Sequence, residues 1–191
     1  MIEVRTIAVI GAGPVGRAIA QLAARGGYRT ILEDLLPNAL RRAESEIRSQ
    51  LDRAVASGGV SADAAGKALS LLEFAGTVED AARPADFVIE AVPEELESKI
   101  EIFTLLDKIC RPGTILASHL SSLSITEISG VTYRAKNCLG MRFAEPVDSQ
   151  KKLEIIRGLE TDDQTVNTAV EVGRRLGKEV VVIKDVASGS S

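Results

Sequence analysis

A glycine-rich segment near the start of the chain has the residue types and the spacing needed to bind a phosphate group. It comprises Gly11, Ala12, Gly13, Pro14, Val15 and Gly16, between an apolar run and a helical pattern that begins at Pro14. Gly11 permits a tight turn, Gly13 lets the backbone approach a pyrophosphate, and Gly16 lets helix and strand pack closely. Pro14 costs the helix little, because the first turn does not need its missing N–H. Free N–H groups and the helix dipole favour an anion here, so the spacing predicts a dinucleotide-binding loop.

Asp34 follows the next apolar run, Arg29–Glu33, at the spacing expected of a carboxylate that binds the adenosine ribose hydroxyls. The same charge repels a 2′-phosphate, so NAD is favoured over NADP. Glu33 is its neighbour, and strand alternation predicts that its side chain points elsewhere. Two plainer interpretations stay open: a structural glycine turn that binds no ligand, and an Asp34 that is only a surface residue at the end of a strand.

The rest of the chain alternates short apolar runs with helical patterns, which is typical of βαβ units around a parallel sheet. We expect strands at residues 6–10, 29–33, 71–75, 87–92, 114–118, 137–141, 153–156 and 179–183. We expect helices at 14–25, 37–55, 62–69, 77–82, 94–109 and 162–176, and a short one opened by a capping box at 124–127. The pattern predicts an α/β fold with a doubly wound, mostly parallel Rossmann-type sheet and helices on both faces. The helical pair after the second strand is an insertion, either a substrate contact or a solvated crossover.

Composition narrows the class of protein. The 191 residues are 45% hydrophobic and 26% charged, as in an ordinary globular domain. We expect an NAD-binding domain at 1–185 and a flexible tail at 186–191. A net charge of −4, scattered Lys and Arg, and 3% aromatic residues argue against nucleic-acid and membrane partners. Cys110 and Cys138 lie far apart with no Cys/His cluster, so we expect reduced core thiols and no metal site. The chain shows no signal peptide and no apolar run long enough to span a bilayer, so we expect a cytoplasmic protein.

Several motifs together resemble the NAD-binding domain of the L-3-hydroxyacyl-CoA dehydrogenases of fatty-acid β-oxidation. They lie at residues 11–21, 88–94, 116–118, 121–126, 146–147 and 176–178, and the resemblance extends over residues 6–185. It implies hydride transfer between the 3-hydroxyl carbon of an acyl-CoA and NAD. It also implies that Glu94 and Lys99 lie beside the nicotinamide ribose, and that Ala91, Val92 and Ser118 contribute to cofactor binding.

The residues that move the proton depart from that family. The resemblance implies a His–Glu pair, with Glu154 as the orienting carboxylate and Ser121 as the group that binds the substrate oxygen. The position of the histidine is occupied by Arg142, and Glu145 replaces an asparagine three residues later. A guanidinium has a pKa above about 12 and accepts no proton at neutral pH. Arg142 can instead donate hydrogen bonds to a carbonyl or carboxylate, or form an ion pair with Glu154.

His119 is the only histidine in the chain, two residues before Ser121. Residues two apart in an extended segment share a face, so His119 is a candidate for a relocated base acting on a substrate bound at Ser121. The alternative is a polar residue near the nicotinamide with no role in proton transfer.

Three functions follow. The chain is an NAD-dependent dehydrogenase of the 3-hydroxyacyl-CoA type, an NAD-binding sensor or regulatory module without turnover, or an NAD enzyme for an acidic substrate clamped by Arg142. The family continues into a helical domain that closes the cleft and forms the dimer. We therefore expect a second domain or a partner protein over the cleft, and the oligomeric state stays open.

Overall fold

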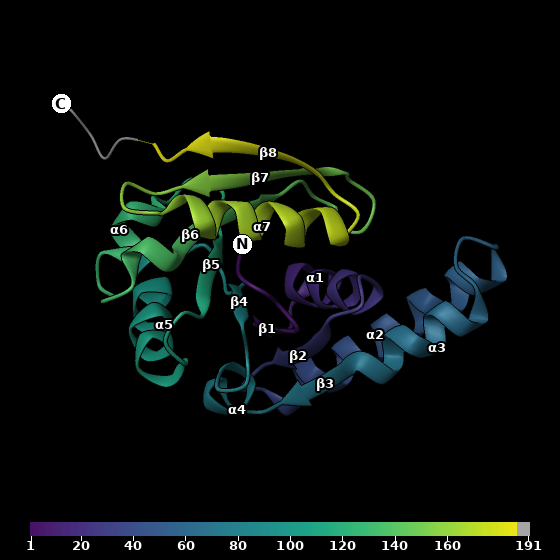
Figure 1. The fold of residues 1–191 in the computed structure, drawn as a ribbon. Helices are drawn as coiled ribbons and strands as arrows, with labels where there is room; N and C mark the ends of the chain where they lie inside the picture. Colours follow the sequence, from purple (N-terminus) through teal and green to yellow (C-terminus); the bar gives the residue numbers. More distant parts are fainter. Residues whose placement is uncertain (187–191) are drawn as a thin grey trace.

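An eight-stranded sheet forms the centre of the computed structural model, which describes residues 1–186 (Figure 1). Its strands are β1 Thr6–Ile10, β2 Arg29–Glu33, β3 Leu72–Ala75, β4 Phe87–Glu90, β5 Ile115–His119, β6 Cys138–Phe143, β7 Lys152–Arg157 and β8 Glu179–Lys184. The order across the sheet is β3-β2-β1-β4-β5-β6-β7-β8. The first six strands are parallel, β7 is antiparallel to β6, and β8 is parallel to β7. The doubly wound, mostly parallel sheet predicted from the sequence is confirmed.

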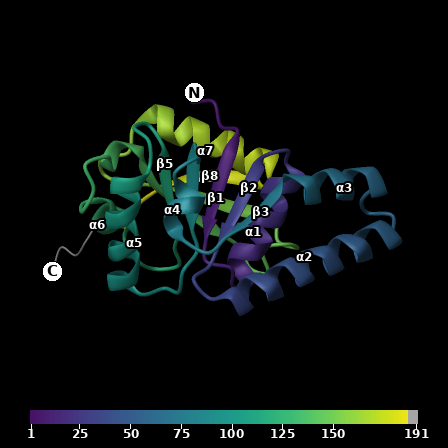
Figure 2. The same ribbon diagram turned by 90° about the horizontal axis from the view of Figure 1, so that it is seen from below.

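Helices cover both faces of the sheet. They are α1 Pro14–Arg25, α2 Pro37–Ala56, α3 Ala62–Leu71, α4 Val78–Ala82, α5 Leu96–Ile109, α6 Ile125–Ser129 and α7 Asp163–Arg175, with a 3₁₀ turn at Ala135–Asn137. Apolar side chains of α1, α2, α3 and α7 join one buried cluster, and those of α4, α5 and α6 join the other. Figure 1 and Figure 2 show α2 and α3 extending beyond the sheet as a pair. This is the insertion expected after the second strand.

Four helices begin with a capping hydrogen bond, at the positions where the sequence predicted that these helices start. The side chains of Ser61, Thr77, Ser124 and Asp162 each accept a bond from the backbone N–H three residues later. Such caps satisfy an N–H that the helix leaves unpaired. Both cysteines, Cys110 and Cys138, are buried and free, as expected.

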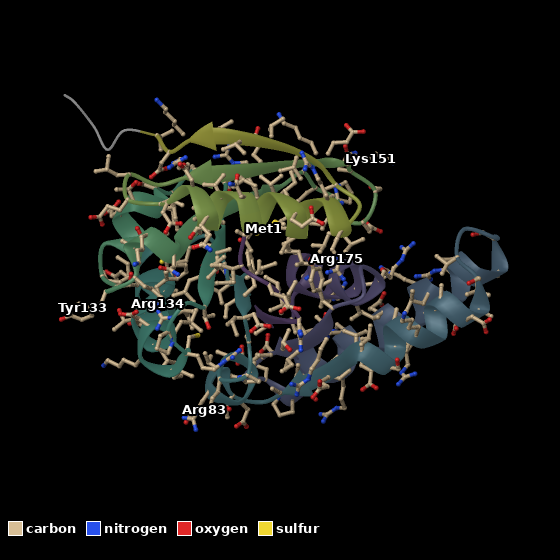
Figure 3. The ribbon with its side chains drawn as sticks, viewed as in Figure 1. Met1, Arg83, Tyr133, Arg134, Lys151 and Arg175 are labelled. Carbon is tan, nitrogen blue, oxygen red and sulfur yellow. The ribbon has the colours of Figure 1, made fainter. Side chains whose placement is uncertain are left out.

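The last helix is held to the first by one arginine. Arg175 of α7 lies with its guanidinium carbon 3.9 Å from the centre of the Tyr28 ring. Its Nε and Nη2 donate to the carbonyl of Gly26 at 3.2 and 2.9 Å. Figure 3 shows the Arg175 side chain beside α1. The contact joins α7 to the turn between α1 and β2.

The segment around residue 90 differs from the prediction. The strand expected at 87–92 ends at Glu90, because the N–H of Val92 turns back to the Glu90 carboxylate at 2.8 Å. The helix expected from residue 94 begins at Leu96. The chain between them therefore forms a loop at the edge of the sheet. Residues 187–191 of the predicted tail lie outside the described residues.

Winding in both directions from β1 brings the candidate site residues to one edge. The loops that follow β1, β2, β4 and β5 all leave the carboxyl ends of parallel strands. In such sheets ligands bind outside these ends, where the strand order reverses, here between β1 and β4. No helix in residues 1–186 has the length and apolar character required to cross a membrane.

Candidate functional site

Two glycines of the loop are required by the fold, whereas a third is not. Gly11 has a φ of +101°, and a Cβ on Gly16 would lie 1.7 Å from the Gly11 carbonyl oxygen. Both glycines are therefore required by the fold itself. Gly13 has an ordinary φ of −70°, and a Cβ added there meets no atom within 4 Å. The space beside Gly13, at the N-terminus of α1, is open, and binding of a pyrophosphate there stays a prediction.

Asp34 is fixed directly against this loop. Its carboxylate accepts hydrogen bonds from the N–H of Ala12 at 3.0 Å and from the N–H of Leu36 at 2.9 Å. The side chain is half-buried, so part of it remains accessible beside the loop. This position agrees with a ribose-binding carboxylate, and the contact itself stays a prediction.

A groove continues from the loop toward α2. It is lined by Pro14, Val15, Arg17, Ala18, Gln50, Glu145, Pro146, Val147 and Asp148. Gln50 belongs to α2, so the helical insertion contributes to this groove. Lys178 supports the opposite wall, because its buried ammonium donates to the carbonyls of Val147 and Gln150. The structure thus favours a functional part for the insertion over a wholly solvated crossover.

A buried polar cluster lies under the loop after β4. The Glu90 carboxylate accepts from Lys99 Nζ at 2.8 Å, from Val92 N at 2.8 Å and from Ser118 Oγ at 2.5 Å. Lys99 Nζ also donates to the carbonyls of Val92 and His119, at 3.2 and 3.0 Å. Glu90, Lys99 and Ser118 are all 0% exposed. The cluster holds the ends of β4, β5 and α5 together.

Lys99 and Ser118 were expected among the cofactor contacts. In the structure both side chains are buried and their polar atoms bond to protein groups, and a contact of either residue with a cofactor stays a prediction. Ala91 and Val92 remain half-buried at the loop, where contact with a cofactor is available. Glu90 was not predicted as a site residue. Its signal is an acidic residue at the end of an otherwise apolar strand, nine positions before a lysine.

Glu94 and the loop that carries Ser121 are joined by hydrogen bonds that the sequence did not predict. Exposed Glu94 accepts hydrogen bonds from the backbone N–H groups of Ser121, Ser122 and Leu123 at 3.0, 3.4 and 3.1 Å. Partial burial raises the pKa of Glu94, but these three bonds outweigh it and hold the pKa below its usual range. An ionised Glu94 therefore orders the loop that exposes the Ser121 side chain.

Arg142 and Glu154 stand opposite each other on β6 and β7. Arg142 Nη1 donates to Glu154 Oε2 at 2.7 Å, and its Nε donates to the Leu120 carbonyl at 3.3 Å. Lys152 Nζ lies 2.9 Å from the other oxygen of Glu154. Lys152 and then Arg142 lower the pKa of Glu154. The ion pair predicted from the sequence is present, and neither partner accepts a proton near neutral pH.

His119 lies at the end of β5 with its ring centre 6.0 Å from that of Phe143. Its Nδ1 is buried and has no hydrogen-bond partner in residues 1–186. Burial lowers the pKa of His119, and nearby Lys99 lowers it further, while Glu145 raises it. Because β5 ends at His119, the alternation that aligned it with Ser121 stops there. The role of His119 as a relocated base stays a hypothesis.

Comparison with known proteins decides the family. The sequence model described as "3-hydroxyacyl-CoA dehydrogenase, NAD binding domain" matches residues 6–186. The chain belongs to this family. A probable 3-hydroxybutyryl-CoA dehydrogenase of Bacillus subtilis is 38% identical over 96% of this chain and 63% of its own length. The 3-hydroxyadipyl-CoA dehydrogenase of Escherichia coli is 36% identical over 95% of this chain and 38% of its own.

The fold agrees with a solved member of the 3-hydroxyacyl-CoA dehydrogenase family. The crystal structure of 3-hydroxybutyryl-CoA dehydrogenase from Escherichia coli K12 superposes with a TM-score of 0.93 at 33% identity. The match covers 97% of this chain and 39% of that one. The chain thus spans less than two thirds of these relatives. Family membership makes NAD the cofactor of this domain.

Proposed function

We propose that this chain is the cofactor-binding part of an NAD-dependent oxidoreductase acting on a 3-hydroxyacyl-CoA or its 3-oxo form, with a weakened proton-transfer step. The bond of 2.7 Å between Arg142 Nη1 and Glu154 Oε2 is the observation that carries the proposal. It stands where the family resemblance implies a His–Glu pair. General base catalysis typically contributes about 10²- to 10⁴-fold in rate, and this pair cannot supply it.

The geometry suggests a role for each remaining group. The glycine loop and Asp34 bind the dinucleotide, and Glu94 holds the loop that presents Ser121 to the substrate oxygen. Arg142 donates a hydrogen bond from the same side, which polarises a carbonyl but does not remove a hydroxyl proton. NAD, when bound, supplies the hydride acceptor. Reduction of a 3-oxo substrate takes a hydride from NADH at C3 and a proton at the oxygen, and oxidation of the alcohol releases the same proton. Without a His–Glu pair this proton is exchanged with water, so the step is weakened in both directions.

A second candidate is an NAD enzyme for a substrate that carries a carboxylate. The side chain of Arg142 is 35% exposed, and within residues 1–186 no protein acceptor bonds to its Nη2. A guanidinium with a free edge favours a carboxylate. The relative named 3-hydroxyadipyl-CoA dehydrogenase has an adipyl group, whose far end is a carboxylate, in the substrate of its name.

The wider setting is also part of the proposal. We infer a single NAD-binding domain at 1–185, acting in β-oxidation in the cytoplasm on an acyl-CoA. We further infer that a second domain or a partner protein covers the cleft. The length of the relatives supports this, since each extends well beyond the matched region.

Binding and turnover should be measured in the same preparation. NADH binding is followed by fluorescence, and NADH oxidation is followed with acetoacetyl-CoA, for the wild type, Arg142→His and Arg157→His. Arg157 is a matched control, because it is on β7, is 38% exposed and pairs with Asp163 away from the cleft. We expect NADH binding in all three proteins and a gain in turnover of about 100-fold only in Arg142→His.

Other outcomes contradict the proposal in distinct ways. NADH binding without turnover in every variant would make the chain an NAD-binding module. Equal turnover in the wild type and Arg142→His would show that Arg142 does not limit the reaction. Turnover that is faster in the wild type, and only with dicarboxylic acyl-CoA substrates, would establish the second candidate.

A further inference from the structure

Glu33 is a buried acid directly beneath the glycine loop. It is the last residue of β2 and is 2% exposed. Its backbone carbonyl accepts the N–H of Gly11 at 2.9 Å, so residue and loop are joined. Its side-chain Oε1 is buried and has no hydrogen-bond partner among the described residues. Nothing in the proposed hydride transfer uses this carboxyl.

Glu33 differs from Glu90, the other buried glutamate at this end of the sheet, in the partners of its carboxyl group. Ile10 pairs with Glu33 on one side and with Glu90 on the other, so the two glutamates stand in one row and project from the same face. Glu90 has Lys99, Ser118 and a backbone N–H as partners. For Glu33 the structure records no cation and no hydroxyl partner in residues 1–186. One buried acid of the row is therefore compensated and the other is not.

The charged groups around Glu33 do not supply a cation to its carboxyl group. Asp34 follows it directly and is negative. On β3, Glu73 is exposed and bonds to Arg29. On α4, which packs against β2, Glu79 and Asp80 are exposed, and so is Arg83 directly after the helix. On α1, which packs on the opposite face of β2, Arg17 is half-buried and Arg25 is exposed. On β1 and the glycine loop, the neighbours Ile10 and Gly11 carry no charge.

A carboxyl in such a place favours its neutral form. Burial disfavours the ionised form, and the adjacent Asp34 charge adds to the effect. Together they raise the pKa of Glu33 to about 7, and the Gly11 N–H offsets part of the rise. Glu33 therefore changes charge across neutral pH, next to the loop that receives a pyrophosphate.

We propose that Glu33 makes NAD(H) binding by this chain dependent on pH, because its protonated form is the form that binds. Ionised Glu33 places a second negative charge beside Asp34 and under the loop, where it opposes the two charges of the pyrophosphate. By linkage, a dinucleotide that binds the protonated form more tightly takes up a proton when it binds the ionised form. The affinity for NADH is then level below about pH 7 and falls above it.

The test is an NADH titration from pH 6 to pH 8.5 with the wild type, Glu33→Gln and Glu73→Gln. Glu33→Gln keeps the shape of the side chain and removes its charge. Glu73→Gln removes an exposed charge from the neighbouring strand. We expect the dissociation constant of the wild type and of Glu73→Gln to rise about five- to tenfold over this range. In Glu33→Gln we expect it to stay level, at the value that the wild type has at pH 6.

A second measurement does not depend on a variant. Calorimetry of NADH binding at pH 7.5, in two buffers of different ionisation enthalpy, should show proton uptake by the wild type. A flat wild-type titration, no proton uptake, or a Glu33→Gln profile like that of the wild type would overturn the inference. Because it rests only on the cofactor assignment, lack of NADH binding at every pH would overturn both, whereas binding that is flat with pH overturns this inference alone.

Discussion

Arg142 and Glu154 face each other across β6 and β7, and their bond of 2.7 Å stands where the family resemblance implies a His–Glu pair. The carboxylate also contacts Lys152, so it is held by two cations. The dinucleotide-binding half of the site does not depend on this pair. Under the proposed function, the glycine loop binds NAD, whereas the Arg142–Glu154 pair supplies no group that transfers a proton.

Glu154 should become essential once a base is restored. In Arg142→His the imidazole would face Glu154 across the strand pair, and the carboxylate would orient it and stabilise its charged form. We expect Arg142→His/Glu154→Gln to lose most of the gain of Arg142→His, about tenfold or more in the rate of NADH oxidation. Glu154→Gln alone should change the slow wild-type rate little. If the double variant is as fast as Arg142→His, Glu154 has no part in the reaction.

Substitution of two glycines of the same loop should have different effects, one on NADH binding and the other on stability. Gly13→Ala should fold normally, because its Cβ meets no protein atom, but weaken NADH binding about tenfold, or about 1.4 kcal/mol. Gly16→Ala should lower the free energy of unfolding by about 3 kcal/mol, because its Cβ collides with the Gly11 carbonyl. Urea unfolding and fluorescence titration separate the two effects. An unchanged NADH affinity in Gly13→Ala would show that the pyrophosphate does not bind beside Gly13.

The charge of Asp34 should set the preference between the two dinucleotides. Asp34→Asn keeps the size of the side chain and an oxygen for the Ala12 N–H, but it removes the repulsion of a 2′-phosphate. We expect the ratio of NADPH to NADH dissociation constants to narrow about tenfold. Titration of both nucleotides measures it, with Asp52→Asn on the outer side of α2 as the control. An unchanged ratio would place the ribose elsewhere.

Removing one partner of the buried Glu90–Lys99 pair should lower the free energy of unfolding. Lys99→Met leaves the Glu90 carboxylate without its cation, and we expect the free energy of unfolding to fall by about 3–5 kcal/mol. The double variant Lys99→Met/Glu90→Gln removes the uncompensated charge and should recover part of that loss. Urea unfolding at pH 7 tests the comparison. A double variant that is less stable than Lys99→Met would contradict the cluster as described.

Protonation of Glu33 should also appear in the stability of the free protein. The folded chain holds this proton up to about pH 7, whereas an unfolded glutamate releases it near pH 4.5. The wild type should therefore lose stability relative to Glu33→Gln as pH rises from about 4.5 to about 7, by up to about 3 kcal/mol. Exposed Glu97→Gln is the control and should show no such trend. Parallel unfolding curves for the wild type and Glu33→Gln across this range would refute the raised pKa.

Local features of the fold could be predicted from the sequence, and tertiary partners could not. The helix starts at Ser61 and Asp162 depend on a hydrogen bond three residues away, so spacing alone indicates them. The burial of Lys99 depends on acceptors nine residues before it and twenty after it, which meet only when β4 and β5 pair. The missing cation at Glu33 is likewise a property of the packed sheet, and no local pattern indicates it.

The site divides in the same way. The glycine loop lies between a strand and a helix that the sequence pattern indicates, and the Arg142–Glu154 pair was expected from the family resemblance. The hydrogen bonds from the 121–123 loop to Glu94 cross between two loops, and no periodicity relates them. Ser121 was therefore identified by its motif, while the group that holds it in place emerged only from the structure.

We propose that Arg142 leaves an NAD site without the group that transfers the proton. A single-turnover measurement tests it most directly, with acetoacetyl-CoA mixed against the preformed NADH complex at pH 7 and NADH absorbance followed in the wild type and Arg142→His. Equal NADH affinity, together with a rate constant about 100-fold higher in Arg142→His, is the result we predict. The same rate constant in both proteins, with NADH fully bound, would contradict the account.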